Sequence, residues 1–400
     1  MAVNAERGGG GTRPGSQTAL RSRNVLLVVD ALIADGAATQ AELSRSTGLS
    51  RATVSNIVRT MVDAGLATVS PTTSSGRRAH LVTLEGRGAV AVGIDFGRRH
   101  ARVVLISLGH EVLGEREIPL PAGHRAQEGI AAGAALLDEL LDEYAVDRTA
   151  VLGVGVGIPG PIDRRTGTVV EGAILPEWVG LNLRDALEER IGFPVHLDND
   201  ANLGALAQVT WGPQPAPSTV VFLKIGTGIG CGLIVAGAPF YGHVGTAGEI
   251  GHSPIGDSGP LCRCGNRGCL ELAASTSMMT EVLSRAQGEP VTTADVVRNA
   301  LRGDTATLRV LEDAGLAAGR ALAGVVNLIN PEVVVVGGPL AELGEILLDP
   351  VRRGISRYAM PLASETTTVV MSSLGARAEA LGAAALVLRQ PGLPLALHAS

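Results

Sequence analysis

Residues 249–271 read E-I-G-H-S-P-I-G-D-S-G-P-L-C-R-C-G-N-R-G-C-L-E, and they hold three of the chain's four cysteines within eight positions. Cys262, Cys264 and Cys269, with His252 ten residues upstream, offer three thiolates and one imidazole. That is the ligand set of a closed tetrahedral zinc site, and the nearby glycines permit tight turns between the ligands. The stretch therefore predicts a structural Zn²⁺ ion bound by these four residues.

Two other interpretations of the cysteines are open, namely buried inert thiols and a disulfide. Inert thiols do not explain the tight C-x-C-x4-C spacing. A disulfide is disfavoured because the chain shows no secretion signal, and disulfides persist in oxidising compartments. Glu249 and Glu271 flank the ligands, so a folded metal loop would hold both carboxylates near one pocket as acceptors for hydroxyl groups.

The same stretch resembles the signature of the ROK family (repressors, open reading frames and sugar kinases), in which G-E-x-G-H is followed by C-x-C-G-x-x-G-C-x-E. Every fixed position of that pattern is present here. The resemblance implies that the histidine and the three cysteines bind a structural zinc ion. It also implies that Glu249, Glu271 and the other edge of His252 face the hydroxyl groups of a hexose.

Composition restricts the class of protein. Four hundred residues allow two or three domains, and 46% hydrophobic residues suffice for large cores. Lys224 is the only lysine among 33 basic residues, which we interpret as a compositional bias. No stretch of about 18 apolar residues occurs, and the N-terminus is polar where a signal peptide would be apolar. We therefore expect a cytoplasmic protein.

Charge is divided unevenly along the chain. Residues 1–86 carry nine arginines against six acidic residues, whereas residues 87–400 carry 24 basic against 33 acidic residues. A small basic part joined to a large acidic part suggests that only the first meets a polyanion.

The N-terminal region predicts a short tail and three helices. Residues 1–18 have no periodic apolar pattern, so we expect a disordered tail there. Apolar periodicity predicts helices over 24–35 and 40–46, and a third that Ser50 caps after a turn at Gly48. This spacing is that of a helix-turn-helix.

The third helix has an inward and an outward face. Val54 and Ile57 fall on the inward face, and the outward residues suit phosphates and base edges. The outward residues are Arg51, Thr53, Ser55, Asn56 and Arg59. Two short strands then enclose a loop with Arg77 and Arg78, which predicts a wing. We thus expect a winged helix-turn-helix DNA-binding domain over residues 19–86. The alternative, a helical adaptor with a solvated polar face, does not account for the turn and the wing together.

Residues 87–400 predict a domain of two lobes. An apolar strand at 90–95 is followed by a returning strand at 101–107, and a similar glycine-turned hairpin recurs at 219–235. Two hairpins of this kind, one at the start of each predicted lobe, indicate an internal duplication. The arrangement resembles the actin and hexokinase fold, with a cleft between the lobes. The predicted fold class is therefore α/β, a winged helix-turn-helix plus a two-lobed actin/hexokinase-like (ROK) domain.

The remaining elements of this domain follow from shorter patterns. Helices are expected at 126–143, 183–190, between the metal loop and about 329, and from 376 onwards, and strands at 150–156, 195–197, 333–336 and 367–371.

The strand at 195–197 runs into the sequence D-N-D-A-N, at the kind of strand end where open α/β sheets bind ligands. Asp200 is the candidate general base, because a carboxylate beside a sugar hydroxyl can prepare it for phosphoryl transfer. Asn199 offers a donor and acceptors for neighbouring hydroxyls. The sequence at 199–202 matches the N-D-A-N motif of the ROK family. The alternative is that these residues are ordinary turn or helix-cap residues.

Two glycine-containing turns bear on nucleotide use. Gly226, Thr227, Gly228 and Gly230 form one candidate phosphate cradle, in which backbone N–H groups can approach an anion. The other turn reads D-F-G-R-R-H at 95–100, where kinases of the family read D-x-G-G-T-K.

Two arginines therefore replace the second glycine and the threonine of this turn. An arginine could grip a phosphate, but Cβ-bearing residues hinder close backbone approach, and degenerate cradles of this kind are characteristic of ROK repressors.

These observations predict a transcriptional regulator and not an enzyme. We expect it to bind operator DNA as a homodimer or homotetramer and to bind a sugar or sugar phosphate in its cleft, with no membrane partner. No residue is expected to turn over substrate, and Asp200 only holds the position of the family's base. Two alternatives are a glucokinase-like, ATP-dependent sugar kinase with an added DNA-binding module and a zinc scaffold that binds no DNA.

Overall fold

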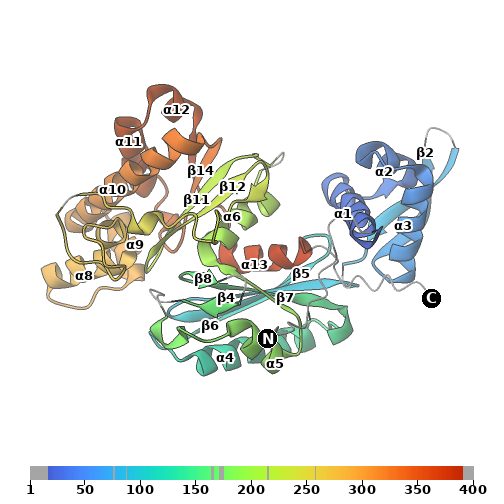
Figure 1. Ribbon diagram of the computed structural model, residues 1–400, viewed down its shortest axis with the longest axis horizontal. Coiled ribbons are helices and arrows are strands. Elements are labelled where there is room, and N and C mark those ends of the chain that lie inside the picture. The colour runs from blue at the N-terminus through green and yellow to red at the C-terminus, as the bar shows by residue number, and fades with distance from the viewer. Residues whose placement is uncertain are drawn as a thin grey trace, which may run out of the picture.

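The computed structural model describes residues 17–74, 77–86, 88–163, 166–170, 175–213, 216–256 and 258–390. Figure 1 shows three parts: a helical module at one end, in blue, and two β-sheets with their own helices. Helices α6 (Asp200–Trp211) and α13 (Ala378–Leu388) lie between the two sheets. The predicted fold class is confirmed. No helix among the described residues is long and apolar enough to cross a membrane.

The N-terminal module is a winged helix-turn-helix. Its elements are α1 (Gln17–Asp35), β1 (Ala38–Thr39), α2 (Gln40–Thr47), α3 (Arg51–Asp63), β2 (Ala67–Ser74) and β3 (Arg77–Leu84), and the strands pair in the order β1-β3-β2. Thr39 and Glu42 cap α2 reciprocally, and the hydroxyl of Ser50 accepts the Thr53 amide at 3.1 Å to start α3. Between these helices Gly48 adopts φ 70°, a left-handed conformation that suits glycine. The predicted turn and cap are therefore confirmed.

Two boundaries in this module differ from expectation. Helix α1 begins at Gln17, seven residues before the predicted start at Asn24. Its first turns carry no buried apolar residue that is described, and Leu20 is exposed, so no periodic pattern marks them. The predicted tail over 1–18 lies outside the described residues except for Gln17 and Thr18. The wing strands are also longer than expected, because polar residues on an exposed hairpin continue the ladder to Ser74 and Arg77.

The first large lobe holds a five-stranded sheet in the order β10-β7-β4-β5-β6. Its strands are β4 (Val90–Phe96), β5 (His100–Ser107), β6 (Val112–Pro119), β7 (Val151–Ile158) and β10 (Val195–Asn199). The short elements η1 (Arg148–Ala150), β8 (Ile162–Asp163), β9 (Thr168–Val169) and η2 (Pro176–Trp178) connect them. Helices α4 (Ala126–Glu143) and α5 (Leu183–Ile191) cover the face opposite α13 (Figure 1).

The second large lobe repeats this topology. Its sheet has the order β13-β12-β11-β14-β15, formed by β11 (Val220–Ile225), β12 (Ile229–Val235), β13 (Ala238–Pro239), β14 (Val333–Gly337) and β15 (Thr368–Met371). In both sheets an antiparallel hairpin is followed by two parallel strands. The predicted internal duplication is therefore confirmed.

Helices of the second lobe follow the metal loop. They are α7 (Glu271–Ala274), α8 (Thr276–Gln287), α9 (Thr293–Leu301), α10 (Thr305–Ile329), α11 (Glu345–Tyr358) and α12 (Pro361–Thr366), with 3-10 turns η3 (Ile250–His252), η4 (Ala341–Leu343) and η5 (Gly375–Arg377). The apolar faces of α10 and α11 pack together and close the lobe's core.

Small residues let α6 and α13 approach their neighbours at backbone distance. A Cβ added at Gly382 would lie 1.8 Å from the Leu203 carbonyl oxygen, and one at Gly93 would lie 1.9 Å from that of Ala380. Helix α13 therefore rests directly on α6 and on β4 of the first lobe. The ends of both helices that face the cleft are thus held firmly by the two sheets.

Candidate functional site

A cavity of about 290 Å³ opens between the two lobes, where strands of both sheets end. Its lining includes every residue predicted for sugar binding and the glycine turn between β11 and β12. These residues are Asn199, Asp200, Glu249, His252, Glu271, Gly226, Thr227, Gly228 and Gly230. The structure thus brings together residues that are up to 72 positions apart, from Asn199 to Glu271.

Asp200 is the first residue of α6 and is almost fully buried. Its Oδ1 accepts the Ala201 amide at 2.8 Å, and its Oδ2 accepts the Lys224 ammonium at 2.8 Å. Asn199 caps the same helix, because its Oδ1 accepts the Ala201 amide at 2.9 Å while its Nδ2 donates to the Gly160 carbonyl at 3.1 Å. Both residues border the cavity. Asn199 is also a helix cap, which was the alternative interpretation of this motif from the sequence.

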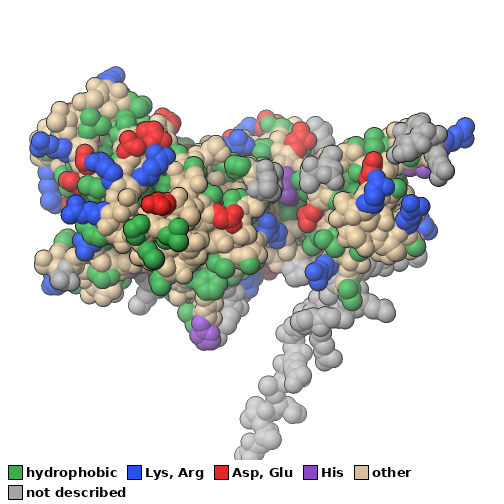
Figure 2. All heavy atoms as spheres, turned by 90° about the horizontal axis from the view of Figure 1, so that it is seen from above, with side chains coloured by type: hydrophobic (Ala, Val, Ile, Leu, Met, Phe, Trp, Pro, Cys, Tyr) green, Lys and Arg blue, Asp and Glu red, His purple; other side chains and the backbone are tan. Residues whose placement is uncertain are grey.

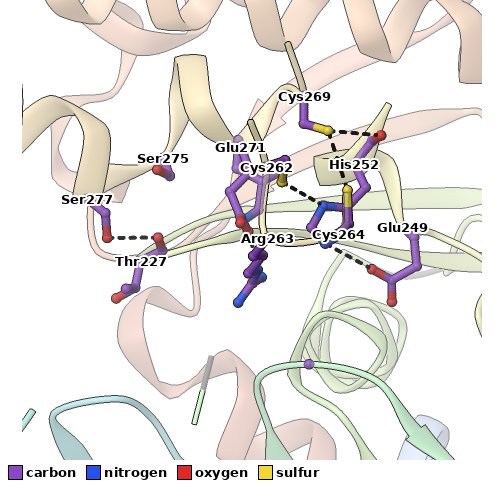
Figure 3. A network of polar contacts seen from close by, with 12 residues as sticks. Thr227, Glu249, His252, Cys262, Arg263, Cys264, Cys269, Glu271, Ser275 and Ser277 are labelled. Atoms are coloured by element: carbon purple, nitrogen blue, oxygen red, sulfur yellow. Dashed lines mark hydrogen bonds and ion pairs between the residues drawn. The ribbon is translucent and has the colours of Figure 1, made fainter. Parts of the chain in front are cut away.

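Glu271 and Glu249 approach the cavity from the metal loop. The Glu271 carboxylate is buried and accepts the Ile229 amide at 3.2 Å. It also accepts the Arg263 guanidinium at 3.0 Å (Figure 3). Glu249 lies 4.0 Å from Nε2 of His252, the ring nitrogen that faces away from Cys262. Hydroxyl groups of a ligand would therefore meet two carboxylates and one imidazole edge on this side.

The four predicted metal ligands meet at one point (Figure 3). Their ligand atoms all lie within 4.8 Å of one another. The Sγ atoms of Cys264 and Cys269 are 3.7 Å apart, and Sγ of Cys262 is 3.5 Å from Nδ1 of His252. A tetrahedron with Zn–S bonds of about 2.3 Å has edges of about 3.7 Å, so the donor set fits one tetrahedral ion. All four cysteines of the chain are free, and the thiol separation is far beyond the ~2.05 Å of a disulfide.

Glycines shape this loop. Gly265 and Gly268 adopt φ values of 89° and 64°, and a Cβ at Gly268 would lie 2.6 Å from the Gly256 carbonyl oxygen. Only glycine tolerates that combination without displacement of the loop. The C-x-C-x4-C spacing therefore closes on itself as predicted.

Sequence reasoning missed three residues of the cavity. Arg263 lies between two of the cysteines in the sequence and donates a hydrogen bond to Glu271. No sequence spacing predicts this contact. Glu379 comes from α13, which is 108 positions after Glu271. Lys224 lies between Asp200 and Glu379, and a single lysine in 400 residues was the one signal that could have identified it.

The first phosphate cradle is obstructed by a side chain other than those expected. Arg98 and Arg99 border the cavity but are exposed. The imidazole of His100 instead folds over the turn, and a Cβ at Gly97 would lie 2.1 Å from its Cε1. Nε2 of His100 is 2.8 Å from Oδ2 of Asp95, which anchors the ring there. The imidazole of His100 thus occupies the space in which a phosphate would have to approach the backbone of this turn. The prediction assigned this obstruction to Arg98 and Arg99.

The second cradle keeps an open glycine turn. The Gly226 amide donates to the Gly228 carbonyl at 2.9 Å, and Ser277 Oγ donates to the Thr227 carbonyl at 2.9 Å (Figure 3). The turn is therefore ordered by the chain itself and borders the cavity.

The outward face of α3 carries the predicted DNA-contacting residues. Arg51, Asn56 and Arg59 are exposed, and Arg59 donates to the Asn56 Oδ1 at 2.9 Å. Thr53 and Ser55, which were also predicted to face outward, are half-buried. Figure 2 shows arginine side chains on the visible face of this module, at the right of the view. In the wing, Arg78 is exposed, while the side chain of Arg77 lies outside the described part of the structure.

Comparison with known proteins covers both parts of the chain. The ROK family profile matches residues 91–390, and the MarR family profile matches residues 22–78. The xylose repressor of Caldicellulosiruptor bescii is 28% identical over 389 residues, which cover 94% of this chain and 97% of that protein.

A solved structure of a ROK family transcriptional regulator, a homologue of the Escherichia coli MLC protein, matches with a TM-score of 0.78 at 27% identity. The match covers 95% of this chain and 99% of that one. The glucokinase of Halalkalibacterium halodurans is 30% identical over 318 residues, but these cover 75% of this chain and 95% of that protein. Similarity to the two regulators thus extends through the winged module, whereas similarity to the kinase leaves a quarter of the chain unmatched.

Proposed function

Because this chain belongs to the ROK family and carries an N-terminal winged helix-turn-helix, we propose that it is a sugar-responsive transcriptional repressor of carbohydrate metabolism genes. The observation that supports this proposal best is similarity to a repressor over 94% of the chain, which includes the DNA-binding module. The cleft supplies the effector site, because carboxylates and amides converge there on a cavity of about 290 Å³. We assign the sugar hydroxyls to Asn199, Asp200, Glu249, His252 and Glu271.

The DNA contacts of the proposed repressor come from α3 and the wing. A recognition helix enters the major groove of one half-site, so a homodimer or homotetramer would read a palindromic operator. We assign base-edge and phosphate contacts to Arg51, Thr53, Ser55, Asn56 and Arg59, and phosphate contacts to Arg77 and Arg78. The domain division at residues 19–86 and 87–400 is part of this proposal.

Two measurements test the function together. Selection from random-sequence DNA should yield a palindromic operator, and calorimetry against pentoses, hexoses, N-acetylhexosamines and their 6-phosphates should identify an effector that changes operator affinity. A coupled assay for ADP release with the same sugars tests the competing kinase function. Turnover above about 1 per second, within the ordinary range of enzymes, would replace the repressor by a sugar kinase with an added DNA module.

We also propose that the ion held by the four soft ligands is zinc. Three thiolates and one imidazole favour Zn²⁺ over hard cations. Two of the separations between ligand atoms, 3.5 Å and 3.7 Å, are close to those of a tetrahedral site, and all four atoms lie within 4.8 Å of one another. When bound, the ion would fix the loop that presents Glu249 and Glu271 to the cleft. Purified protein should therefore contain close to one zinc per chain.

A matched pair of variants checks this assignment. Cys264→Ser should lose most of the zinc and much of the sugar affinity, because both glutamates lose their support. Cys231→Ala, which removes the buried cysteine outside the cluster, should keep the zinc. Equal zinc content in the two variants would show that the cluster is not the metal site.

A further inference from the structure

The only lysine of the chain lies in the cleft. Lys224 is one residue among 32 arginines, and its side chain, 17% exposed, ends between two buried carboxylates. Its Nζ is 2.8 Å from Oδ2 of Asp200 and 3.1 Å from Oε1 of Glu379. All other basic side chains of this protein are arginines. The single lysine at this position therefore indicates that a guanidinium does not fit between the two carboxylates. An ammonium is a compact point charge, whereas a guanidinium is a wide planar fork.

Two carboxylates from two elements contact this ammonium, and a third, from another element, lies within reach of its charge. We call Asp95 of β4, Asp200 of α6 and Glu379 of α13 the carboxylate cage. All three are buried, with 2%, 6% and 3% of their surface exposed. The field of Lys224 reaches each of them, since its charge is a cause of the pKa shifts of both Asp95 and Glu379. Oδ1 of Asp95 has no hydrogen-bond partner among the described residues, and Glu379 has only the ion contact with Lys224 at its Oε1.

A cage of this kind, beside a glycine turn in a cleft, has the donor set that enzymes of phosphoryl transfer use for Mg²⁺. In such enzymes carboxylates hold the ion, and the ion bridges the phosphates of the nucleotide. Here the ammonium of Lys224 stands where that ion would need to be. A magnesium ion therefore does not fit the residues present, since it would require the displacement of a cation that is already paired with two carboxylates.

We propose that Lys224 is a built-in cation, whose ammonium takes the place of a divalent metal ion in the carboxylate cage and holds Asp200 in position for a sugar hydroxyl. The proposal rests on the proposed function insofar as Asp200 contacts the sugar. On this assignment the proposed sugar would bind in the cleft without a metal ion or a nucleotide. Lys224 would then be a second feature that opposes kinase chemistry. The first is the imidazole of His100, which occupies the first phosphate cradle.

Charge balance in the cleft agrees with this assignment. Although burial opposes it, the hydrogen bond from His100 lowers the pKa of Asp95. Burial raises the pKa of Glu379. The geometry pairs Asp95 with His100 and Asp200 with Lys224, each at 2.8 Å. The cage then carries little uncompensated charge to attract a metal ion.

A gain of metal binding tests the proposal directly, with Mn²⁺ as the probe on zinc-saturated protein. Lys224→Ala removes the ammonium and leaves its space open, so the cage should bind one Mn²⁺ per chain that the parent does not bind. Electron paramagnetic resonance of free Mn²⁺ measures this. In the matched control, Lys224→Ala with Glu379→Gln keeps the open space but removes one carboxylate, and Mn²⁺ affinity should fall at least about tenfold. If Lys224→Ala binds no more Mn²⁺ than the parent, the proposal is wrong.

A second measurement uses the parent protein and does not depend on the folding of a variant. Growth on ε-¹³C-lysine labels Lys224 alone, because the chain has no other lysine, and leaves its ammonium unmodified. Stoichiometric Mn²⁺ should leave the Lys224 resonance as sharp as it is without the ion. Selective broadening of the Lys224 resonance would place a metal ion in the cage and overturn the proposal. Both results are independent of sugar and operator binding, so a failure of the proposed function is recognised separately.

Discussion

Asp200 illustrates how one residue can keep a family's position and change its chemistry. A general base needs a free lone pair beside the hydroxyl and a gain in energy on protonation. Here one oxygen of Asp200 accepts a backbone amide and the other accepts Lys224. Each oxygen keeps a further lone pair, so Asp200 can accept a hydrogen bond from a sugar hydroxyl while the ammonium balances its charge.

The first prediction concerns Asp200→Asn. The amide keeps the shape of the side chain but loses a charged acceptor, and the loss of such a hydrogen bond costs roughly 1.5 to 3 kcal/mol. Sugar affinity measured by calorimetry should therefore fall about tenfold to a hundredfold, while operator binding without sugar stays unchanged.

Glu117→Gln provides the control for that prediction. Glu117 borders the same cavity but is partly exposed and paired with Arg102. Its neutralisation should change sugar affinity less than about threefold, because exposed ion pairs contribute little. Equal losses in the two variants would mean that general cavity charge, and not the acceptor at Asp200, determines affinity.

Residues whose role follows from local spacing could be predicted from sequence. The four candidate metal ligands lie within 18 positions, and Asn199 and Asp200 follow a recognisable strand. Lys224 and Glu379 could not, because they come from different elements and only the folded chain joins them. Arg263 is only eight positions from its partner Glu271, but no motif identifies that ion pair. The single lysine was visible but was interpreted as composition, since nothing in the sequence placed it beside Asp200.

At the scale of elements, caps and apolar periods determined which predictions succeeded. Helix α4 occupies residues 126–143 as predicted, because its apolar residues recur at helical spacing. Strand β6 was missed because it lies at the edge of its sheet and alternates charged with partly buried residues, so it has no continuous apolar run. Helix α3 was found through its cap at Ser50 and its buried residues Val54 and Ile57.

The second prediction separates two kinds of DNA contact. Arg51→Ala with Asn56→Ala removes exposed groups from the face of α3 that we assign to base edges, so preference for the selected operator over random DNA should decrease. Arg77→Ala with Arg78→Ala removes the arginines that we assign to phosphates at the wing. That change should weaken binding to all sequences alike and reduce the salt dependence by about one unit of slope for each phosphate that is no longer neutralised.

Gel shifts over a series of salt concentrations measure both effects. Arg285→Ala on α8 removes an exposed arginine of the second lobe and serves as the control. If the α3 variant binds the operator as tightly as the parent, the recognition helix is assigned wrongly.

At the scale of the whole molecule, α6 and α13 connect the cleft with the DNA-binding module. Asp200 and Glu379 stand in their first turns, at the cleft. At the other end, Trp211 of α6 packs against a hydrophobic cluster that includes both α1 and the last residues of α13. Arg389, just after α13, interacts electrostatically with Asp30 of α1. A change in the cleft can therefore reach the module through two helices that touch at backbone distance.

The third prediction uses the pH dependence of this junction. Burial chiefly, with a contribution from Arg389, lowers the pKa of His110 from 6.5 to about 4. The unfolded chain therefore takes up a proton more readily than the folded chain between these values, so stability is unaffected above pH 6.5 and falls as the pH approaches 4.

Because His110 is partly exposed, the loss should be of the order of 2 kcal/mol. His110→Asn keeps a residue that tolerates the observed φ of 63° and does not titrate. Denaturant unfolding between pH 7 and 4 should show a smaller decline for this variant than for the parent. Parallel curves would show that other groups carry the acid sensitivity.

The last prediction concerns coupling between the two sites, and the chain's two tryptophans provide a matched comparison. Trp211 Nε1 donates to the His110 carbonyl at 2.9 Å, and its ring lies 5.5 Å from that imidazole. Trp178 Nε1 donates to the His124 carbonyl at 3.1 Å, and its ring also lies 5.5 Å from the imidazole of that histidine. The two contacts are chemically alike, but Trp211 stands at the junction with the module and Trp178 in the core of the first lobe.

Substitution of either tryptophan by phenylalanine removes one hydrogen bond and keeps an aromatic ring. Trp211→Phe should reduce the factor by which the identified sugar changes operator affinity, while each affinity measured alone changes little. Linkage requires that the operator change sugar affinity by the same factor, so calorimetry with and without operator must give the reduced value as well. Trp178→Phe should leave the factor at its parental value despite a loss of stability at least as large, because Trp178 is fully buried and Trp211 only partly. If both substitutions reduce it equally, coupling reflects the overall stability of the protein, and α6 does not carry it.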